Sequence, residues 1–182
     1  MEELISRLAD ATIGDTFNFY RDGHAAETRR NRLLTYLRER ETAPLLLVGE
    51  AAGYRGARVS GIPFTSERQL TGTGPAEASA TIVHRVLAEL GLEESVLLWN
   101  VVPTHPGTAT SNRRPRAEEV AAGLPFAREL ARERRVIAVG RLAEAVLEGA
   151  PYVRHPSHGG AAEFRAGLLR FRSGGPRVRR FL

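Results

Sequence analysis

The stretch GEAAGYRGARVSGIPF, from Gly49 to Phe64, combines glycines with residue types that can take part in chemistry. It follows the apolar run 45–48, and a short apolar run that breaks into glycines predicts a strand feeding a loop. The glycines allow the backbone to lie against a flat or an anionic ligand. A carboxylate, two aromatic rings and two guanidinium groups accompany them, at Glu50, Tyr54, Phe64, Arg55 and Arg58. We therefore expect this loop to bind a ligand.

Two more polar residues stand where predicted strands end. Asn100 lies near the end of the apolar stretch SVLLWNV (95–101), and His155 opens the loop HPSHGG (155–160). In a parallel sheet, ligands bind at the carboxyl ends of the strands. We therefore expect one site built by three loops.

The elements that position these residues follow from apolar spacing. Helices are predicted at 2–9, 25–40, 76–90, 116–133, 141–148 and 161–171. Strands are predicted at 44–49, 95–101, 135–139 and 151–154. The alternation of strands and helices predicts an α/β fold, a three-layer αβα sandwich around a mostly parallel four-stranded sheet.

Several segments are expected to be irregular. The aromatic segment 11–20 reads as a loop or an extended arm, and 50–75 as one long loop. Pro125 lies within the helix at 116–133 and predicts a kink or a break there. The basic tail, 173–182, is expected to be loosely held.

Length and composition exclude several classes of protein. A chain of 182 residues predicts a single domain over 1–182. The absence of cysteine excludes disulfides, thiolate catalysis and cysteine-ligated zinc or iron–sulfur clusters, and we expect neither a metal nor a cofactor. No apolar run is long enough to span a bilayer, and the first ten residues lack a signal-peptide pattern. We expect a cytoplasmic monomer.

The charge has two explanations. The formal net charge is +5, and all 26 cationic residues are arginine. A GC-rich genome would favour arginine codons over lysine codons. A phosphate-binding face would also use arginine, because guanidinium groups pair well with phosphate oxygens. Both explanations stay open at this point.

Three motifs together resemble the uracil-DNA glycosylase superfamily: GEAAGYRG after the first strand, LLWN ending the second, and HPSHGG after the fourth. In that family the first motif reads Gly-Gln-Asp-Pro-Tyr-His in one branch and Gly-Glu-Ala-Pro-Gly in the iron–sulfur branch. The second motif ends a strand in Asn, and the third reads His-Pro-Ser. The resemblance covers about 45–160 and indicates a branch without the cluster. It implies a monofunctional glycosylase that removes uracil, or another deaminated base, flipped out of DNA.

The resemblance assigns roles in base recognition and catalysis. Phe64 matches the aromatic that stacks on the base. Asn100 matches the side chain whose amide reads O4 and N3–H of uracil, a pattern that cytosine reverses. His155 matches the donor to O2, where negative charge develops, and the backbone N–H groups of Glu50 and Ala51 can add to this stabilisation.

Two departures from the family pattern affect chemistry and specificity. Ala51 stands where one branch keeps the Asp that activates water, so Glu50 is the nearest carboxylate for orienting water or contacting the base. Gly53 stands where that branch keeps a Tyr against C5 of the base. The wall that excludes thymine is therefore expected to be missing.

DNA contacts are assigned to the third motif and to arginines. Ser157 matches a serine that contacts phosphate, and Gly159 and Gly160 permit a close approach of the strand. His158 or Arg165 is the candidate for the side chain that fills the vacated stack. A phosphate track is open to Arg55, Arg58, Arg113, Arg114 and Arg154, each of which is equally explained as a solvated surface residue.

Structural explanations remain open for the three central residues. Phe64 can be a core residue, Asn100 a cap at a strand end, and His155 a packed or solvated ring. At the level of function, a catalytically silent member that binds DNA or a free base is the alternative to the glycosylase. An unrelated α/β nucleotide-handling enzyme is a third possibility, and it predicts that these three residues do not share a pocket.

Overall fold

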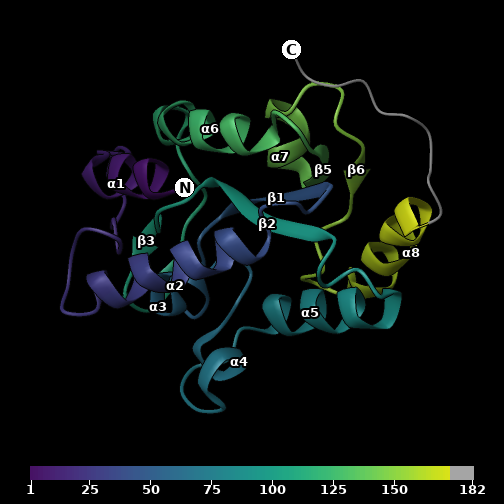
Figure 1. Cartoon of the computed structure of the whole chain (residues 1–182), viewed down its shortest axis with the longest axis horizontal. Helices are drawn as coiled ribbons and strands as arrows, with labels where there is room; N and C mark the ends of the chain where they lie inside the picture. The colour runs from purple at the N-terminus through teal and green to yellow at the C-terminus, as the bar shows by residue number, and fades with distance from the viewer. Residues whose placement is uncertain (173–182) are drawn as a thin grey trace.

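Four parallel strands form the central sheet of the computed structural model, which describes residues 1–172. The tail 173–182, for which loose packing was expected, lies outside the described residues. The strands run in the order β2-β1-β5-β6 (Figure 1), with the bounds β1 Leu45–Ala51, β2 Val96–Val102, β5 Arg135–Val139 and β6 Tyr152–Val153. The predicted four-stranded parallel sheet is confirmed.

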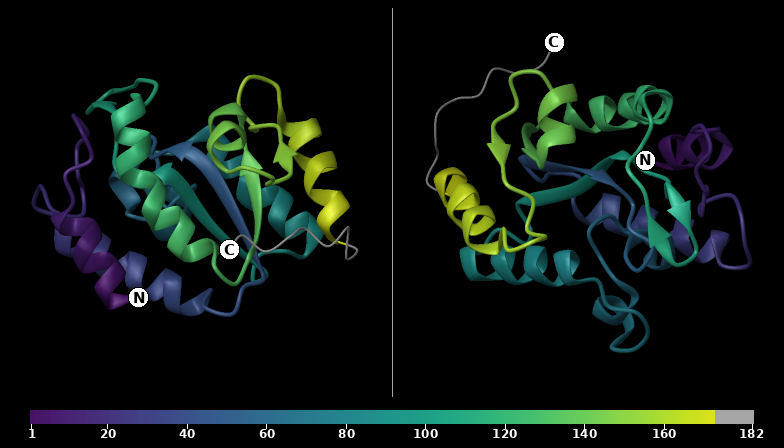
Figure 2. Two further views of the ribbon diagram at one scale, coloured as in Figure 1. Left: turned by 90° about the horizontal axis from the view of Figure 1, so that it is seen from above. Right: turned by 180° about the vertical axis from the view of Figure 1, so that it is seen from behind.

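Helices cover both faces of this sheet, as the two views of Figure 2 show. One layer contains α1 and α2 with α6 and α7, and the other contains α5 and α8. Their bounds are α1 Glu2–Asp10, α2 Ala26–Glu39, α5 Ala78–Leu90, α6 Ala117–Ala131, α7 Arg141–Val146 and α8 Ala161–Arg172. The predicted αβα sandwich is therefore confirmed, and its helix bounds agree to within a few residues.

The two layers exist because successive strand side chains point to opposite faces. Leu46 and Val48 of β1 pack with α1, α2, α6 and α7 in one buried cluster. Leu45 and Leu47 of the same strand pack with α5 and α8 in the other. Because β1 is buried on both faces, its sequence is a continuous apolar run rather than an alternating one.

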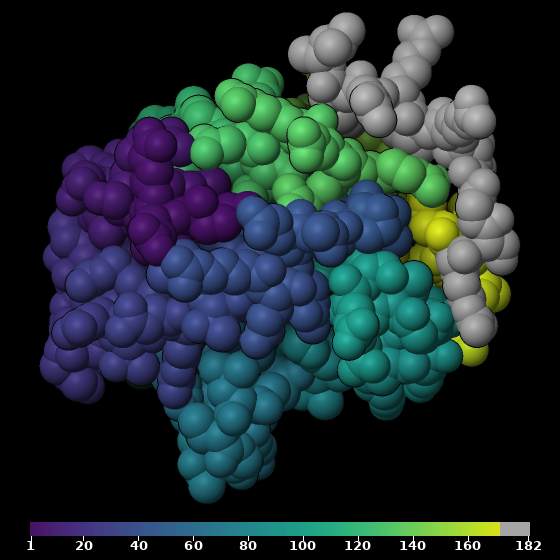
Figure 3. Space-filling view, in the orientation of Figure 1, coloured from purple at the N-terminus to yellow at the C-terminus, as the bar shows by residue number. Residues whose placement is uncertain are grey.

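The expectation of one long loop over 50–75 is wrong, because two short helices lie within it. They are α3 (Ala57–Ser60) and α4 (Glu67–Thr71). A capping box, in which Ser66 and Gln69 each bond the other's backbone, begins α4. The segment around α4 projects from the body of the molecule (Figure 3). Helices of four or five residues bury too few side chains to leave an apolar period in the sequence.

Of the kink or break predicted at Pro125, the break does not occur, since α6 continues through this residue. Pro125 is exposed, whereas Leu124, Phe126, Ala127 and Leu130 on either side are buried. Burial of residues on both sides of the proline holds the helix together, although proline cannot donate the usual backbone hydrogen bond.

A hairpin and the N-terminal arm, residues 11–20, lie at one end of the sheet. The segment 103–116 contains a two-stranded antiparallel hairpin, β3 (Gly107–Thr108) and β4 (Ser111–Asn112). The arm pairs with the segment that precedes this hairpin through Phe17 and His105. The fully buried ring of His105 lies between two backbone carbonyls, with Nδ1 2.7 Å from the Ala52 oxygen and Nε2 2.8 Å from the Thr108 oxygen. The hairpin is thereby fixed to the end of β1.

No helix among residues 1–172 is long and apolar enough to cross a membrane.

Candidate active site

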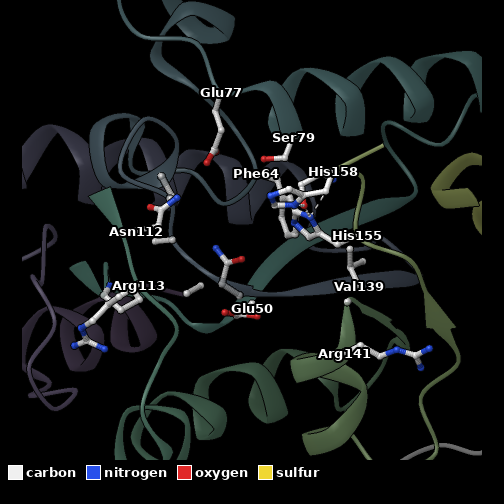
Figure 4. A pocket seen from close by; sticks show the side chains of 18 residues that line it. Glu50, Phe64, Glu77, Ser79, Asn112, Arg113, Val139, Arg141, His155 and His158 are labelled. Carbon is white, nitrogen blue, oxygen red and sulfur yellow. Dashed lines mark hydrogen bonds between the residues drawn. The ribbon is translucent and has the colours of Figure 1, made fainter. Parts of the chain in front are cut away.

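The predicted loops meet at a pocket of about 390 Å³ at the carboxyl ends of the strands (Figure 4). Phe64, Asn100 and His155 all line it, as do Glu50, Ala51 and Gly53. The other lining residues are Ala52, Ala57, Glu77, Ser79, Pro106, Asn112, Arg113, Val139, Gly140, Arg141, Ser157 and His158. Three segments that are far apart in the chain therefore build one site, which disagrees with the third possibility raised from the sequence.

The side chains of Phe64 and Asn100 both lie next to Gly49. Parallel pairing sets Gly49 directly beside Asn100 on the neighbouring strand. A Cβ atom on Gly49 would lie 2.2 Å from Cζ of Phe64 and 3.1 Å from Oδ1 of Asn100. A glycine is therefore required for the aromatic ring to lie against the strand end, next to the buried amide of Asn100.

A tight turn holds Phe64 in place. Its φ of +53° lies in the left-handed region, which is unfavourable for a residue with a side chain. The hydroxyl of Ser60 donates to the Thr65 carbonyl at 2.6 Å, and the hydroxyl of Thr65 donates to the Pro63 carbonyl at 3.1 Å. From α5, Nε2 of His84 lies 3.0 Å from the Thr65 hydroxyl. These bonds offset the strain and fix the orientation of the ring.

The geometry of His155 sets its tautomer. The backbone N–H of Ser157 donates to Nδ1 over 3.2 Å, so Nδ1 is an acceptor. A neutral ring with this bond carries its proton on Nε2. Burial lowers the pKa of His155, and the nearby His158 lowers it further. The ring is therefore neutral at pH 7, with an Nε2–H that has no hydrogen-bond partner among residues 1–172.

Two carboxyl groups face the pocket from different sides, as Figure 4 shows. Burial raises the pKa of Glu50, and the positive charge of Arg114 partly opposes this. Burial also raises the pKa of Glu77. Only Glu50 was predicted from the sequence.

The third motif forms a strained loop beside His155. The Ser157 hydroxyl lies 2.8 Å from Nδ1 of His155 and 3.1 Å from Nδ1 of His158. His158 is exposed at the pocket rim with a φ of +51°. Gly159 does not line the pocket, but its φ of +77° makes the turn. Gly160 is required sterically, since a Cβ there would lie 2.2 Å from the His155 carbonyl.

Two of the arginines predicted to bind phosphate instead make contacts within the protein. Arg113 makes a two-pronged ion pair with Glu119, which is fully buried, and also donates to the Asp15 carbonyl at 2.8 Å. The guanidinium of Arg58 lies 5.1 Å from the centroid of the Phe17 ring, and its Nε is buried without a hydrogen-bond partner within 1–172. Both side chains are therefore explained by packing.

The remaining arginines of that set are exposed. Arg55 stacks over the Tyr54 ring at 5.2 Å, and Arg114 lies near Glu50. Arg154 donates to the His158 carbonyl at 3.2 Å and thereby braces the third motif. The other wedge candidate, Arg165, bonds Glu89 at 3.1 Å and does not line the pocket.

Sequence reasoning missed several pocket residues. Asn112 accepts a hydrogen bond from the Tyr54 backbone at 2.9 Å and so joins the hairpin to the first motif. Glu77 directly precedes α5, Ser79 lies in its first turn, and Arg141 begins α7. Only Arg141 had a usable signal in the sequence, because it lies just after the end of the predicted strand 135–139.

The family model for the uracil DNA glycosylase superfamily matches residues 38–174, which include all three motifs. The chain belongs to the uracil-DNA glycosylase superfamily. Members of the superfamily are generally DNA glycosylases, which are hydrolases. The resemblance drawn from the three motifs is thereby confirmed.

A solved structure shares the fold of this chain. The crystal structure of wild-type SMUG2 from Pedobacter heparinus superposes with a TM-score of 0.68 and covers 95% of each chain. The two sequences are 13% identical. No curated protein matches the sequence closely enough to count as a relative.

Proposed function

We propose that this protein is a monofunctional DNA glycosylase that hydrolyses the N-glycosidic bond of uracil, or of another deaminated base, rotated out of DNA. The observation that carries the proposal is the convergence of Phe64, Asn100 and His155 on one pocket, where the Nε2–H of His155 has no hydrogen-bond partner among residues 1–172. An aromatic face holds a planar base, an amide reads its edge, and a neutral imidazole N–H stabilises the negative charge that develops on it.

Recognition of the base uses two surfaces. Phe64 stacks on the ring, a contact worth about 1–3 kcal/mol that does not depend on which base is present. Asn100 then discriminates, because its amide donates to O4 and accepts from N3–H of uracil, whereas cytosine presents the reverse pattern. Burial of Asn100 makes a mismatch costly, since an unsatisfied polar group would remain out of water.

Cleavage transfers an electron pair to the base. The bond between C1′ and N1 breaks, and the departing base becomes an anion with charge on O2, while the sugar develops oxocarbenium character. His155 donates its Nε2–H hydrogen bond to O2 as this charge grows. The backbone N–H groups of Glu50 and Ala51 add to the same stabilisation. A neutral donor suffices here, because it needs only to strengthen its hydrogen bond in the transition state.

Water completes the reaction by adding to C1′ and losing a proton, which leaves an abasic site and the free base. Ala51 supplies no carboxylate for this step, so Glu50 orients the water. Burial raises the pKa of Glu50 towards the range in which a carboxylate accepts a proton more readily.

DNA is held by the third motif. The Ser157 hydroxyl and the exposed side chain of His158 stand at the pocket rim, where the phosphates of an extruded nucleotide would pass. The left-handed turn at Gly159 brings this backbone to the surface. Arg55 and Arg114 are the exposed arginines in the proposed phosphate track.

Single-turnover excision from duplex and single-stranded oligonucleotides tests the proposal. The panel carries uracil, hypoxanthine, xanthine, thymine or cytosine opposite guanine, and uracil in a single strand. We expect release of at least one deaminated base. His155→Ala should slow that release about 100- to 1,000-fold, the typical cost of removing one oxyanion donor. Asn100→Ala should remove the preference for uracil over cytosine.

His24→Ala is the matched control, because His24 is exposed and does not line the pocket. It should excise at the wild-type rate. Release of no base from any member of the panel would contradict the proposal.

A catalytically silent binder of DNA or of a free base is the second candidate, and Ala51 favours it because the water-activating carboxylate of one branch is absent. Tight binding to a uracil-containing oligonucleotide without base release would support this reading instead.

A further inference from the structure

Glu77 fills a part of the pocket that two glycines leave open. A Cβ atom on Gly53 would lie 2.0 Å from Oε1 of Glu77, and one on Gly56 would lie 2.0 Å from its Oε2. The carboxyl group therefore lies flat against the backbone of the first motif, in the space that side chains at Gly53 and Gly56 would otherwise occupy. It enters the pocket from a different side than His155 and Glu50 do (Figure 4).

No structural partner accounts for this placement. Among residues 1–172, the Glu77 side chain makes no hydrogen bond and no ion pair, although it is half-buried. Burial raises the pKa of Glu77, so the placement carries an energetic cost. A carboxyl group that lines a binding pocket with free oxygens is available to a ligand.

We infer that Glu77 forms the wall of the pocket against the C5 edge of the bound base and sets which substituents that edge can carry. The inference rests on the proposed function. With O2 at His155 and the N3–O4 edge at Asn100, the C5 edge is the one that neither side chain covers. Gly53 and Gly56 contribute no side chain there, and within residues 1–172 the side-chain atoms nearest to both glycines belong to Glu77.

Thymine differs from uracil only by a methyl group at C5, so it tests this wall directly. The methyl group would collide with the carboxyl group, or would cover its oxygens without bonding them. Glu77 should therefore exclude thymine, although Gly53 taken alone suggests an open pocket. The earlier expectation that a wall is missing applies to position 53 but not to the pocket as a whole.

The experiment compares single-turnover excision of uracil and thymine, each opposite guanine, by wild type, Glu77→Ala and Glu77→Gln. Truncation to Ala should lower the uracil-to-thymine rate ratio about tenfold or more, the usual range for one methyl group in a pocket. Glu77→Gln keeps the volume and should stay near the wild-type ratio. Glu94→Ala is the matched control, because Glu94 is exposed and lies outside the pocket.

A binding measurement distinguishes failure of this inference from failure of the proposed function. Oligonucleotides with 2′-fluoro-deoxyuridine or 2′-fluoro-thymidine resist cleavage, so their dissociation constants report pocket fit without catalysis. If no base is released but Glu77→Ala increases the affinity for the thymidine oligonucleotide relative to the uridine one, the role of Glu77 as the C5 wall is supported and the glycosylase proposal fails. If Glu77→Ala leaves both ratios unchanged, or slows uracil and thymine excision equally without changing binding, the wall is refuted.

Discussion

At the scale of single residues, the site depends on where side chains are absent. Gly49 leaves room for the Phe64 ring at the end of β1, and Gly160 leaves room for the backbone of His155. In both places the nearest atoms belong to groups that the proposed mechanism needs in fixed positions. The glycines of the motifs are therefore explained by packing around the pocket as well as by backbone freedom.

Gly49→Ala should displace the Phe64 ring, because the new Cβ would lie 2.2 Å from Cζ of that ring. We expect a loss of about 1–3 kcal/mol in the free energy of unfolding, as for other overpacked sites. Uracil excision should slow with it, because the stacking face moves. Urea unfolding and single-turnover rates measure the two effects.

A double-mutant cycle with Phe64→Ala identifies the cause. Once the ring is removed, Gly49→Ala should cost under about 0.5 kcal/mol, since the two substitutions share one contact. An equal cost in both backgrounds would show that the ring is not what constrains position 49.

At the scale of elements, the sequence predicted the layers well, because long helices and buried strands leave an apolar period. The strand ends and the three motifs followed from this, and so did the meeting of Asn100 and His155. Glu77 and Asn112 could not be predicted, because short irregular segments place them and no periodicity marks their direction. The same reason explains why α3 and α4 were missed.

Helix α5 contributes to the site through His84, although that residue does not line the pocket. The ring bonds the Thr65 hydroxyl at 3.0 Å and also makes a backbone hydrogen bond with Phe64. His84→Ala should weaken binding of a uracil-containing oligonucleotide about tenfold, the equivalent of one or two lost hydrogen bonds. The turn at Phe64 would then have fewer constraints on its left-handed backbone.

Thr65→Val is the companion variant, because it removes the same bond from the other side with little change in volume, together with the bond that the hydroxyl donates to the Pro63 carbonyl. The two substitutions together should cost less than the sum of their separate costs, since they act on one interaction. Fluorescence anisotropy with a cleavage-resistant oligonucleotide gives the dissociation constants. Full additivity would show that His84 does not act through the turn.

At the scale of the whole molecule, one buried ion pair joins three distant parts of the chain. Glu119 of α6 bonds Arg113 next to the hairpin, and Arg113 also bonds the Asp15 carbonyl of the N-terminal arm. The Arg113 hydrogen bond is the main cause that lowers the pKa of Glu119 to about 2 from its ordinary value of 4.5. The pocket wall near Arg113 therefore depends on a carboxylate that must stay ionised.

The pKa of Glu119 fixes how stability should depend on pH. The folded pKa lies below the unfolded one, so the contribution of Glu119 is complete above pH 4.5 and is lost as the pH falls towards 2. Glu119→Gln should cost on the order of 3 kcal/mol at pH 7, given about 1.4 kcal/mol per pKa unit. The difference between wild type and variant should shrink below pH 4.5.

Other buried groups also titrate, so the comparison must be a difference between variants. The pKa values of His84 and His155 are lowered by burial, and these residues reduce stability as the pH falls below 6.5. Those of Glu50 and Glu77 are raised, so these residues act in the opposite sense. All four contributions are common to wild type and Glu119→Gln, and they cancel when the two are compared at each pH.

Urea unfolding at pH 7, 5 and 3 measures that difference. Glu118→Gln is the matched control, because Glu118 is exposed and its nearest cation, Arg116, lies 3.9 Å away. Exposed pairs contribute at most about 1 kcal/mol, so the control should stay near wild type at every pH. A Glu119→Gln deficit that stays constant from pH 7 to pH 3 would show that lost packing, rather than the charge shared with Arg113, holds the hairpin and the arm to α6.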